Sequence, residues 1–219
     1  MKPRQGKVRG SLTAAFVLLL VTAFTASIAS EIAKPIPDEE LVKRLVAGGY
    51  TIYFRHEATD WSLQDKVNKR DDWLSCNPAR MRQLSEAGRD SARKTGLAIR
   101  NLGIPVARVF ASPYCRTMES ALLMELAEIE ASGSVMNLRV AEYFGGRKAI
   151  IANARHLLGQ APPAGSNHVI VAHGNVAINA TSIYPDEGEG LVFQADAESG
   201  FIFVGRLTPE EWRRLAEIP

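Results

Sequence analysis

Short apolar runs alternate with amphipathic segments along most of this chain, and this alternation limits its fold more than any other feature. The runs 50–54, 106–111 and 168–172 have the length and the β-branched or aromatic content of buried strands. Segments of helical period lie between them, from Ser85 to about Leu102, from about Cys115 to Ser132 and from Arg147 to Leu158. Because strands that alternate with helices form a largely parallel sheet, we expect a three-layer α/β/α domain.

The two ends of this domain are expected to depart from the alternation. Before the first strand, Asp38 can cap a short helix that Gly48-Gly49 ends. A further strand is expected near Leu138 and a short helix from about Asn175. The runs 191–194 and 201–204 then flank a polar turn and predict an antiparallel hairpin at the sheet edge. Thr208-Pro-Glu-Glu211 predicts the start of a final helix.

The first 29 residues have the three parts of a secretory signal. Basic residues at positions 2, 4, 7 and 9 precede an uncharged stretch from Ser11 to Ser30. The small residues Ser27 and Ala29 predict cleavage after Ala29, which leaves one domain of residues 30–219. The expected location is the periplasm. The alternative is an uncleaved membrane anchor with the domain facing outward, because a positive N-terminal flank stays inside.

The net charge gives no reason to expect a nucleic-acid partner. The whole chain has 26 Lys and Arg against 24 Asp and Glu, a net charge of +2. Four of those cations and no acidic residue fall in the signal, so its removal changes the net charge from +2 to −2. The basicity therefore belongs to the export segment. We expect contact with a membrane only if that segment stays uncleaved.

Histidine and arginine residues follow three of the expected strands. The first strand runs into Arg55-His56, the second into the segment of Arg116, and a later one into His173. Because ligands bind beyond the carboxyl ends of parallel strands, we expect two imidazoles and two guanidinium groups to converge there.

This convergence favours phosphate chemistry. Two guanidinium groups at one point match an anion with several oxygens. Guanidinium groups also keep a nearby imidazole neutral, and neutral imidazole is a nucleophile toward phosphorus. A second imidazole can donate to the transferring group, and the backbone N–H groups at Gly174 and Asn175 can add further donors.

At these positions the sequence resembles the histidine phosphatase superfamily, the phosphoglycerate mutase-like enzymes. The resemblance runs from Tyr50 to about Thr181 and rests on four motifs in family order. They are Arg55-His56, Leu84-Ser-Glu-Ala-Gly88-Arg, Ala111-Ser-Pro-x-x-Arg116-Thr-x-x-x-Ala121 and Ala172-His-Gly-Asn175. The resemblance implies an α/β phosphatase that needs no metal ion or other cofactor.

The resemblance also implies a role for each matching residue. His56 is then the nucleophile that becomes phosphorylated. Arg55, Arg116 and His173 hold the phosphoryl group, with Thr59 as an added hydroxyl contact.

The proton donor is left open among three carboxylates. In the mutase branch of the family a glutamate follows a strand after the second arginine, and Glu142 fits that place. Glu57 stands where the family usually has glycine after the nucleophile, so it points away from phosphate, repels anionic substrates or is itself the donor. Asp60 is the third candidate. Such an acid must hold its proton near pH 7, which requires burial or nearby negative charge.

Cys76 and Cys115 are the only thiols, and we expect them to form a disulfide in an oxidising compartment. This bridge would pin the polar insertion 61–82 beside Arg116; the alternative is two buried free cysteines. The insertion carries two tryptophans and both signs of charge. We treat it as a solvated loop that can form part of the substrate wall.

No metal site is expected. His56, Glu57 and His173 include possible ligands, but they lack the His-Glu-x-x-His spacing, and two arginines would repel a divalent cation. His156 and His168 have no partner motif near them.

Together these features predict an exported, metal-independent phosphomonoesterase of the histidine acid phosphatase type, with a phosphohistidine intermediate and a small phosphate ester as substrate. A sugar phosphate of the cell envelope is one substrate that export and the resemblance allow. The alternative is a catalytically weak phosphate-binding or envelope-interaction protein that keeps the fold, and Glu57 is the residue that favours it.

Overall fold

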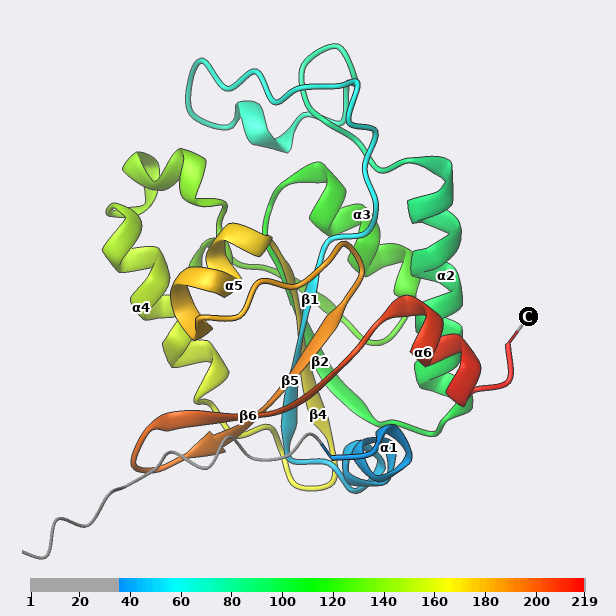
Figure 1. Ribbon diagram of the computed structural model, residues 1–219. Helices are drawn as coiled ribbons and strands as arrows, with labels where there is room; N and C mark the ends of the chain where they lie inside the picture. The colour runs from blue at the N-terminus through cyan, green and yellow to red at the C-terminus, as the bar shows by residue number, and fades with distance from the viewer. Residues whose placement is uncertain (1–35, 219) are drawn as a thin grey trace, which may run out of the picture. The chain divides into compact units, whose positions relative to one another are not determined.

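A six-stranded sheet forms the centre of the domain in the computed structural model, which describes residues 36–218 (Figure 1). The expected signal, residues 1–29, lies outside the described residues. The strands are β1 (Tyr50–Arg55), β2 (Val106–Ala111), β3 (Ile129–Ala131), β4 (Asn167–Ala172), β5 (Gly190–Asp196) and β6 (Gly200–Leu207). Their order is β3-β2-β4-β1-β5-β6. The first four in this order pair in parallel, and β5 and β6 form an antiparallel hairpin at the β1 side. The expected sheet with an edge hairpin is confirmed.

Helices cover both faces of this sheet (Figure 1). They are α1 (Asp38–Ala47), α2 (Glu86–Asn101), α3 (Cys115–Met124), α4 (Arg147–Leu158), α5 (Gly174–Thr181) and α6 (Pro209–Leu215), with 3-10 segments η1 (Asp72–Leu74), η2 (Gly133–Val135) and η3 (Leu138–Phe144). Successive strand residues enter opposite cores because side chains alternate across a strand. Along β4, Val169 and Val171 pack with residues of α1, α2, α3 and α6, whereas Ile170 and Ala172 pack with residues of α4 and α5. The three-layer α/β/α prediction is therefore confirmed.

The final helix begins as its sequence predicts. The Thr208 hydroxyl accepts a hydrogen bond from the Glu211 N–H, and the Glu211 carboxylate accepts one from the Thr208 N–H. These reciprocal bonds satisfy donors that the first turn of a helix leaves unpaired. No helix among residues 36–218 is long and apolar enough to span a bilayer.

The expected end of one helix and the expected type of one element were wrong. The helix that begins at Cys115 ends at Met124 and not at Ser132, because Glu125 adopts a left-handed conformation with a φ of 51°. The released chain then forms the short edge strand β3. The strand expected near Leu138 is instead η3. There the side chain of Asn137 accepts the Arg139 N–H at 3.0 Å, and the Val140 N–H bonds to the Asn137 carbonyl at 3.1 Å.

Candidate active site

The sheet brings His56 and His173 together. They directly follow the neighbouring strands β1 and β4, in which Arg55 pairs with Ala172, and the His56 N–H donates to the Ala172 carbonyl at 2.9 Å. The two imidazole rings lie edge to face, with 5.7 Å between their centroids. The structure therefore unites two histidines that are more than 100 residues apart in the chain, as the position of each after a parallel strand predicts.

The buried imidazole of His56 has one fixed tautomer. Its Nδ1 lies 2.9 Å from the Glu57 carbonyl, and because a carbonyl only accepts, Nδ1 carries the proton and donates it. The lone pair is then on Nε2. Burial, and secondly the charge of Arg116, hold the pKa of His56 well below its ordinary value of 6.5, although the bond to the carbonyl opposes this shift. His56 is therefore neutral and available as a nucleophile at neutral pH.

His173 is also buried and neutral. Burial and the nearby Arg116 hold its pKa well below 6.5. Its Nε2 lies 2.8 Å from the Ser112 hydroxyl, while Nδ1 has no hydrogen-bond partner within residues 36–218. When Ser112 donates to Nε2, the ring proton is on Nδ1. This N–H can then serve an oxygen of a bound anion.

Arg55 and Arg116 flank the two histidines, and each already contacts a carboxylate. The Arg116 guanidinium is 3.0 Å from Asp65, and both side chains are almost fully buried. Arg55 lies 3.5 Å from Glu187 and donates to the Pro185 carbonyl at 3.2 Å. Paired guanidinium groups have a defined orientation, which favours multidentate binding of phosphate.

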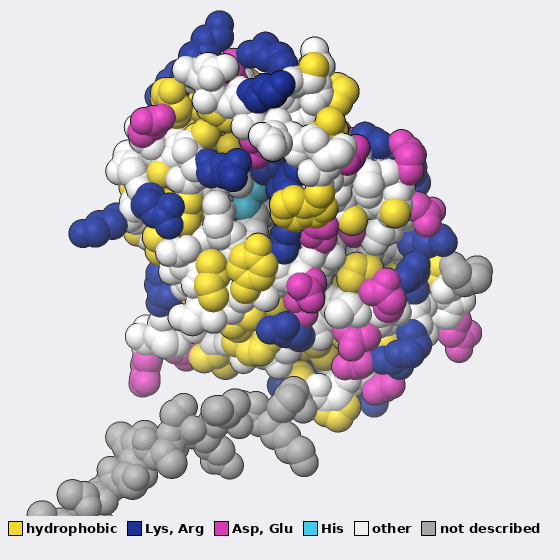
Figure 2. Space-filling model, turned by 45° about the horizontal axis from the view of Figure 1, so that its top comes forward, with side chains coloured by type: hydrophobic (Ala, Val, Ile, Leu, Met, Phe, Trp, Pro, Cys, Tyr) yellow, Lys and Arg dark blue, Asp and Glu magenta, His cyan; other side chains and the backbone are white. Residues whose placement is uncertain are grey.

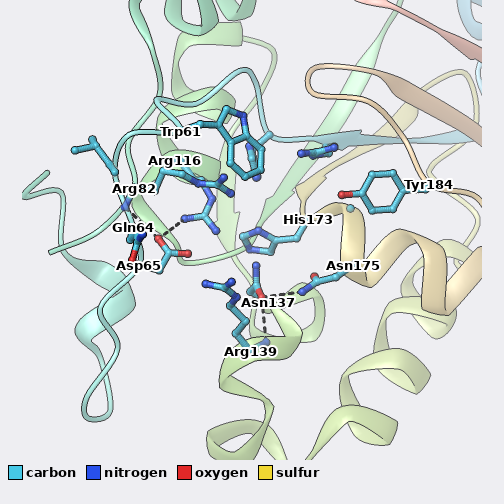
Figure 3. Close-up of a pocket in the computed structure, with 14 residues that line it drawn as sticks. Trp61, Gln64, Asp65, Arg82, Arg116, Asn137, Arg139, His173, Asn175 and Tyr184 are labelled. Atoms are coloured by element: carbon cyan, nitrogen blue, oxygen red, sulfur yellow. Dashed lines mark hydrogen bonds and ion pairs between the residues drawn. The ribbon is translucent and has the colours of Figure 1, made fainter.

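These residues line a cavity of about 510 Å³. Figure 2 shows a histidine in a hollow of the surface, with Lys and Arg side chains around it. Figure 3 shows the lining side chains, which come from the ends of β1 and β4, from the 61–82 insertion, from η3 and from the starts of α3 and α5. The lining residues are Arg55, His56, Trp61, Leu63, Gln64, Asp65, Arg82, Arg116, Asn137, Arg139, His173, Gly174, Asn175 and Tyr184.

Asn175 lies in this wall, at the start of α5. Its side-chain N–H₂ donates to the Asn137 side-chain oxygen at 2.9 Å (Figure 3). Gly174 precedes it in the first turn, where backbone N–H groups have no acceptor inside the helix. The backbone N–H groups of this first turn can therefore donate to an anion, and phosphate binding by Asn175 stays a prediction.

The structure leaves four of the sequence candidates outside the cavity wall. Thr59 donates its hydroxyl hydrogen to Glu187 at 2.9 Å, and the exposed Asp60 accepts from Ser62; both line a different surface cavity. Glu142 is exposed on η3 and does not follow a strand. The expectation that Glu142 comes directly after a strand was wrong, because the preceding segment is a 3-10 helix.

Glu57, the fourth of these residues, is buried behind the cavity. Its side chain is only 1% exposed and contacts Gly188. Burial raises its pKa from 4.5 to about 7; the Ser91 hydroxyl opposes the shift, and the charges of Glu210 and Glu187 add to it. Of the three possibilities for Glu57, the structure supports the side chain that points away.

Asp65 is the carboxylate that sequence reasoning missed. It is the acidic residue among those that line the cavity, and it comes from the insertion. Its Oδ1 accepts from Arg116 at 3.0 Å and from the Arg82 backbone N–H at 3.1 Å, which leaves Oδ2 without a bond from the described residues. The conformation of a non-periodic loop gave no sequence signal for this position.

A disulfide fixes this insertion beside Arg116, as expected. Cys76 and Cys115 are bonded, with 5.3 Å between their Cα atoms. Trp73 is also buried and packs against the rings of Tyr143 and Phe144, with centroids 5.3 and 5.4 Å away. The insertion is therefore a fixed wall of the cavity, although most of its residues are polar. No group of three or more His, Cys, Asp or Glu residues that could hold a metal ion occurs in the described part of the chain.

The arrangement of strands and helices is similar to that of several solved structures. An Escherichia coli protein assigned as an alpha-ribazole-5'-P phosphatase is 13% identical, with a TM-score of 0.51 over 73% of this chain and 97% of the other. The chain has the histidine phosphatase, or phosphoglycerate mutase-like, fold. The fold that the motifs imply is thus confirmed.

Two further structures show weaker likeness to this histidine phosphatase fold. The protein histidine phosphatase SixA, complexed with tungstate, is 14% identical over 73% of this chain and 97% of its own, with a TM-score of 0.46. Mycobacterial glucosyl-3-phosphoglycerate phosphatase is 14% identical over 74% of this chain and 100% of its own, with a TM-score of 0.49. No family model and no curated protein matches the sequence.

Proposed function

We propose that this protein is an exported, metal-independent phosphomonoesterase that transfers a phosphoryl group to His56 and then to water. One observation carries the proposal: a neutral imidazole with its Nδ1–H bonded to a carbonyl lies at the base of an open cavity beside two arginines and a second imidazole. Phosphotransferring enzymes need this combination of a free lone pair and fixed donors for the phosphoryl oxygens.

The first step forms a bond between His56 Nε2 and phosphorus and breaks the bond between phosphorus and the ester oxygen. Arg55, Arg116 and the N–H of His173 stabilise the equatorial oxygens. The leaving alcohol takes a proton from a carboxyl group. Asp65 is the donor we propose, because it lines the cavity and its Oδ2 has no bond from the described residues.

The pairing of Asp65 with Arg116 is compatible with this role. A phosphate dianion that binds Arg116 competes with the carboxylate for the guanidinium group. In the second step Asp65 accepts a proton from water, the water oxygen bonds to phosphorus, and the bond to His56 breaks to release phosphate.

The substrate class we propose is a small phosphate ester, with a sugar phosphate of the cell envelope as one member. The basic N-terminal flank and the apolar stretch that follows it support export. The four arginines of the cavity wall support a phosphorylated substrate.

The test is phosphate release from p-nitrophenyl phosphate in EDTA by the wild type and by His56→Ala. We expect the variant to lose at least about 10³-fold in kcat, since no other group lies ready to form the covalent intermediate. His156→Ala is the matched control, because His156 is exposed on α4 and its side chain bonds only to Gln160 among the described residues. Rapid quenching in alkali should trap an acid-labile phosphoprotein in the wild type. Full activity of His56→Ala would refute the proposal, and bound phosphate without turnover in the wild type would favour a phosphate-binding protein.

A further inference from the structure

The wall of the cavity holds more positive charge than one phosphoryl group uses. Four guanidinium groups line it, from Arg55, Arg82, Arg116 and Arg139, against the single carboxylate of Asp65. Arg55 and Arg116 flank His56 and each contacts a carboxylate. The proposed phosphatase reaction accounts for these two arginines. It leaves Arg82 and Arg139 without a role.

Arg82 is held in a position that is unfavourable for an unpaired cation. Its guanidinium carbon lies 3.9 Å from the centroid of the Trp61 ring, so the planar group is stacked on the indole. Burial, and secondly the charge of Arg116, lower the pKa of Arg82 from its ordinary value. No carboxylate within residues 36–218 forms a salt bridge with it. Asp65 and Glu187 act on Arg82 only through their charge at longer range, so this stacked, partly desolvated guanidinium group can gain further stability from an anion that bonds to it directly.

Arg139 reaches the same cavity from a different element. It lies on η3, where Asn137 fixes the start of the 3-10 segment, and Figure 3 shows its side chain extending toward the side where Asp65 and Arg116 lie. No hydrogen bond or salt bridge to its guanidinium group comes from the part of the chain that the structure describes. Arg139 is exposed, as arginines on protein surfaces commonly are, but it lines the same cavity as Arg82, which likewise forms no salt bridge within the described residues.

We propose that Arg82 and Arg139 form a second anion subsite, so that the substrate carries another anionic group near the phosphoryl group that His56 accepts. This inference rests on the proposed function. The chemistry of the second group is that of an oxyanion, either phosphate or carboxylate, because guanidinium groups bind both in the same bidentate manner. A simple phosphomonoester fills only the subsite of Arg55 and Arg116.

Matched ligands test the subsite. Glucose 6-phosphate carries one anionic group, 6-phosphogluconate adds a carboxylate, and glucose 1,6-bisphosphate adds a phosphate. Their Kd values are measured by calorimetry at pH 7 on His56→Ala, which keeps all four arginines but cannot consume the ligand. On the active protein the same ligands are compared as competitive inhibitors of p-nitrophenyl phosphate hydrolysis. We expect at least one of the two-anion ligands to bind about tenfold more tightly than glucose 6-phosphate, a difference of about 1.4 kcal/mol. Whichever ligand shows this preference identifies the second oxyanion.

Two arginine variants and one control then locate the preference. Arg82→Ala and Arg139→Ala, each introduced into His56→Ala, should reduce the ratio of the Kd for glucose 6-phosphate to the Kd for the preferred two-anion ligand to about threefold or less. Arg93→Ala should keep it, because Arg93 is exposed on α2, outside the cavity wall, and its loss removes the same charge. Equal binding of all three ligands by His56→Ala would overturn the subsite. So would a ratio of Kd values that stays near tenfold in both Arg82→Ala and Arg139→Ala.

The two proposals fail in different ways. If the wild type turns over p-nitrophenyl phosphate but shows no preference for a second anion, the phosphatase proposal stands and the subsite proposal is refuted. If the protein prefers a two-anion ligand but does not turn over p-nitrophenyl phosphate, the subsite proposal stands and the phosphatase proposal is refuted.

Discussion

The buried carboxyl group of Glu57 makes the stability of the fold depend on pH. The pKa of Glu57 is raised by burial from 4.5 to about 7. Between these two pH values the folded protein holds a proton that the unfolded chain releases, so the contribution of Glu57 to stability falls as the pH rises. At about 1.4 kcal/mol for each pH unit, the difference corresponds to about 3 kcal/mol between pH 4.5 and pH 8.

Glu57→Gln removes this titration and keeps the shape of the side chain. We expect the free energy of unfolding of the wild type, minus that of Glu57→Gln, to fall by about 3 kcal/mol as the pH rises from 4.5 to 8. Urea denaturation followed by circular dichroism at half-unit pH intervals measures this difference. The buried histidines titrate in both proteins, so their effect cancels in the difference.

A matched control separates burial from the loss of a charge. Glu128→Gln removes one carboxylate from an exposed position, and its difference from the wild type should stay constant over the same pH range within about 0.5 kcal/mol. If the difference for Glu57→Gln also stayed constant within about 1 kcal/mol, Glu57 would titrate normally and the argument from burial would be refuted.

Two further predictions concern the insertion. Asp65→Asn should lower kcat on an alkyl phosphate by about 10²–10⁴-fold but lower it much less on p-nitrophenyl phosphate, whose leaving group needs little protonation; an equal loss on both esters would assign Asp65 a positioning role only. Replacement of both Cys76 and Cys115 by alanine opens a link between residues 39 apart in the chain, and should cost about 4 kcal/mol in urea denaturation; a loss below about 1 kcal/mol would contradict the chain-entropy account.

The sequence predicts the centre of the site better than its walls. Arg55, His56 and His173 adjoin the ends of buried strands, and the register of a parallel sheet brings such ends together whatever lies between them. Their convergence therefore follows from periodicity alone. Asp65 and Arg82 lie in a segment without a period, whose conformation depends on a disulfide and on the burial of Trp73. These long-range contacts leave no local pattern in the sequence.

The misplaced elements have a similar origin. Helix α3 ends where Glu125 takes a left-handed conformation, although neither glycine nor proline marks that position. β3 has three residues and lies at the sheet edge, which is too short for an alternating pattern. Leu138, Val140 and Ala141 are buried residues of η3 itself, so the hydrophobic signal was present but its period was not that of a strand.

The positions of the two imidazoles and of the cavity wall are determined by separate parts of the molecule. The spacing of His56 and His173 is that of adjacent strands, roughly 4.8 Å apart, and is fixed by backbone bonds such as the one from His56 to Ala172. Part of the wall comes from an insertion that is attached to the rest of the fold by its two ends, by the disulfide, by the buried Trp73 and by the ion pair of Asp65 with Arg116. The histidine pair is therefore a constant part and the insertion an exchangeable one. Grafting other loops between Thr59 and Leu84, with Asp65 and the partner of Cys115 retained, is a direct route to variants that keep the same reacting groups and select different esters.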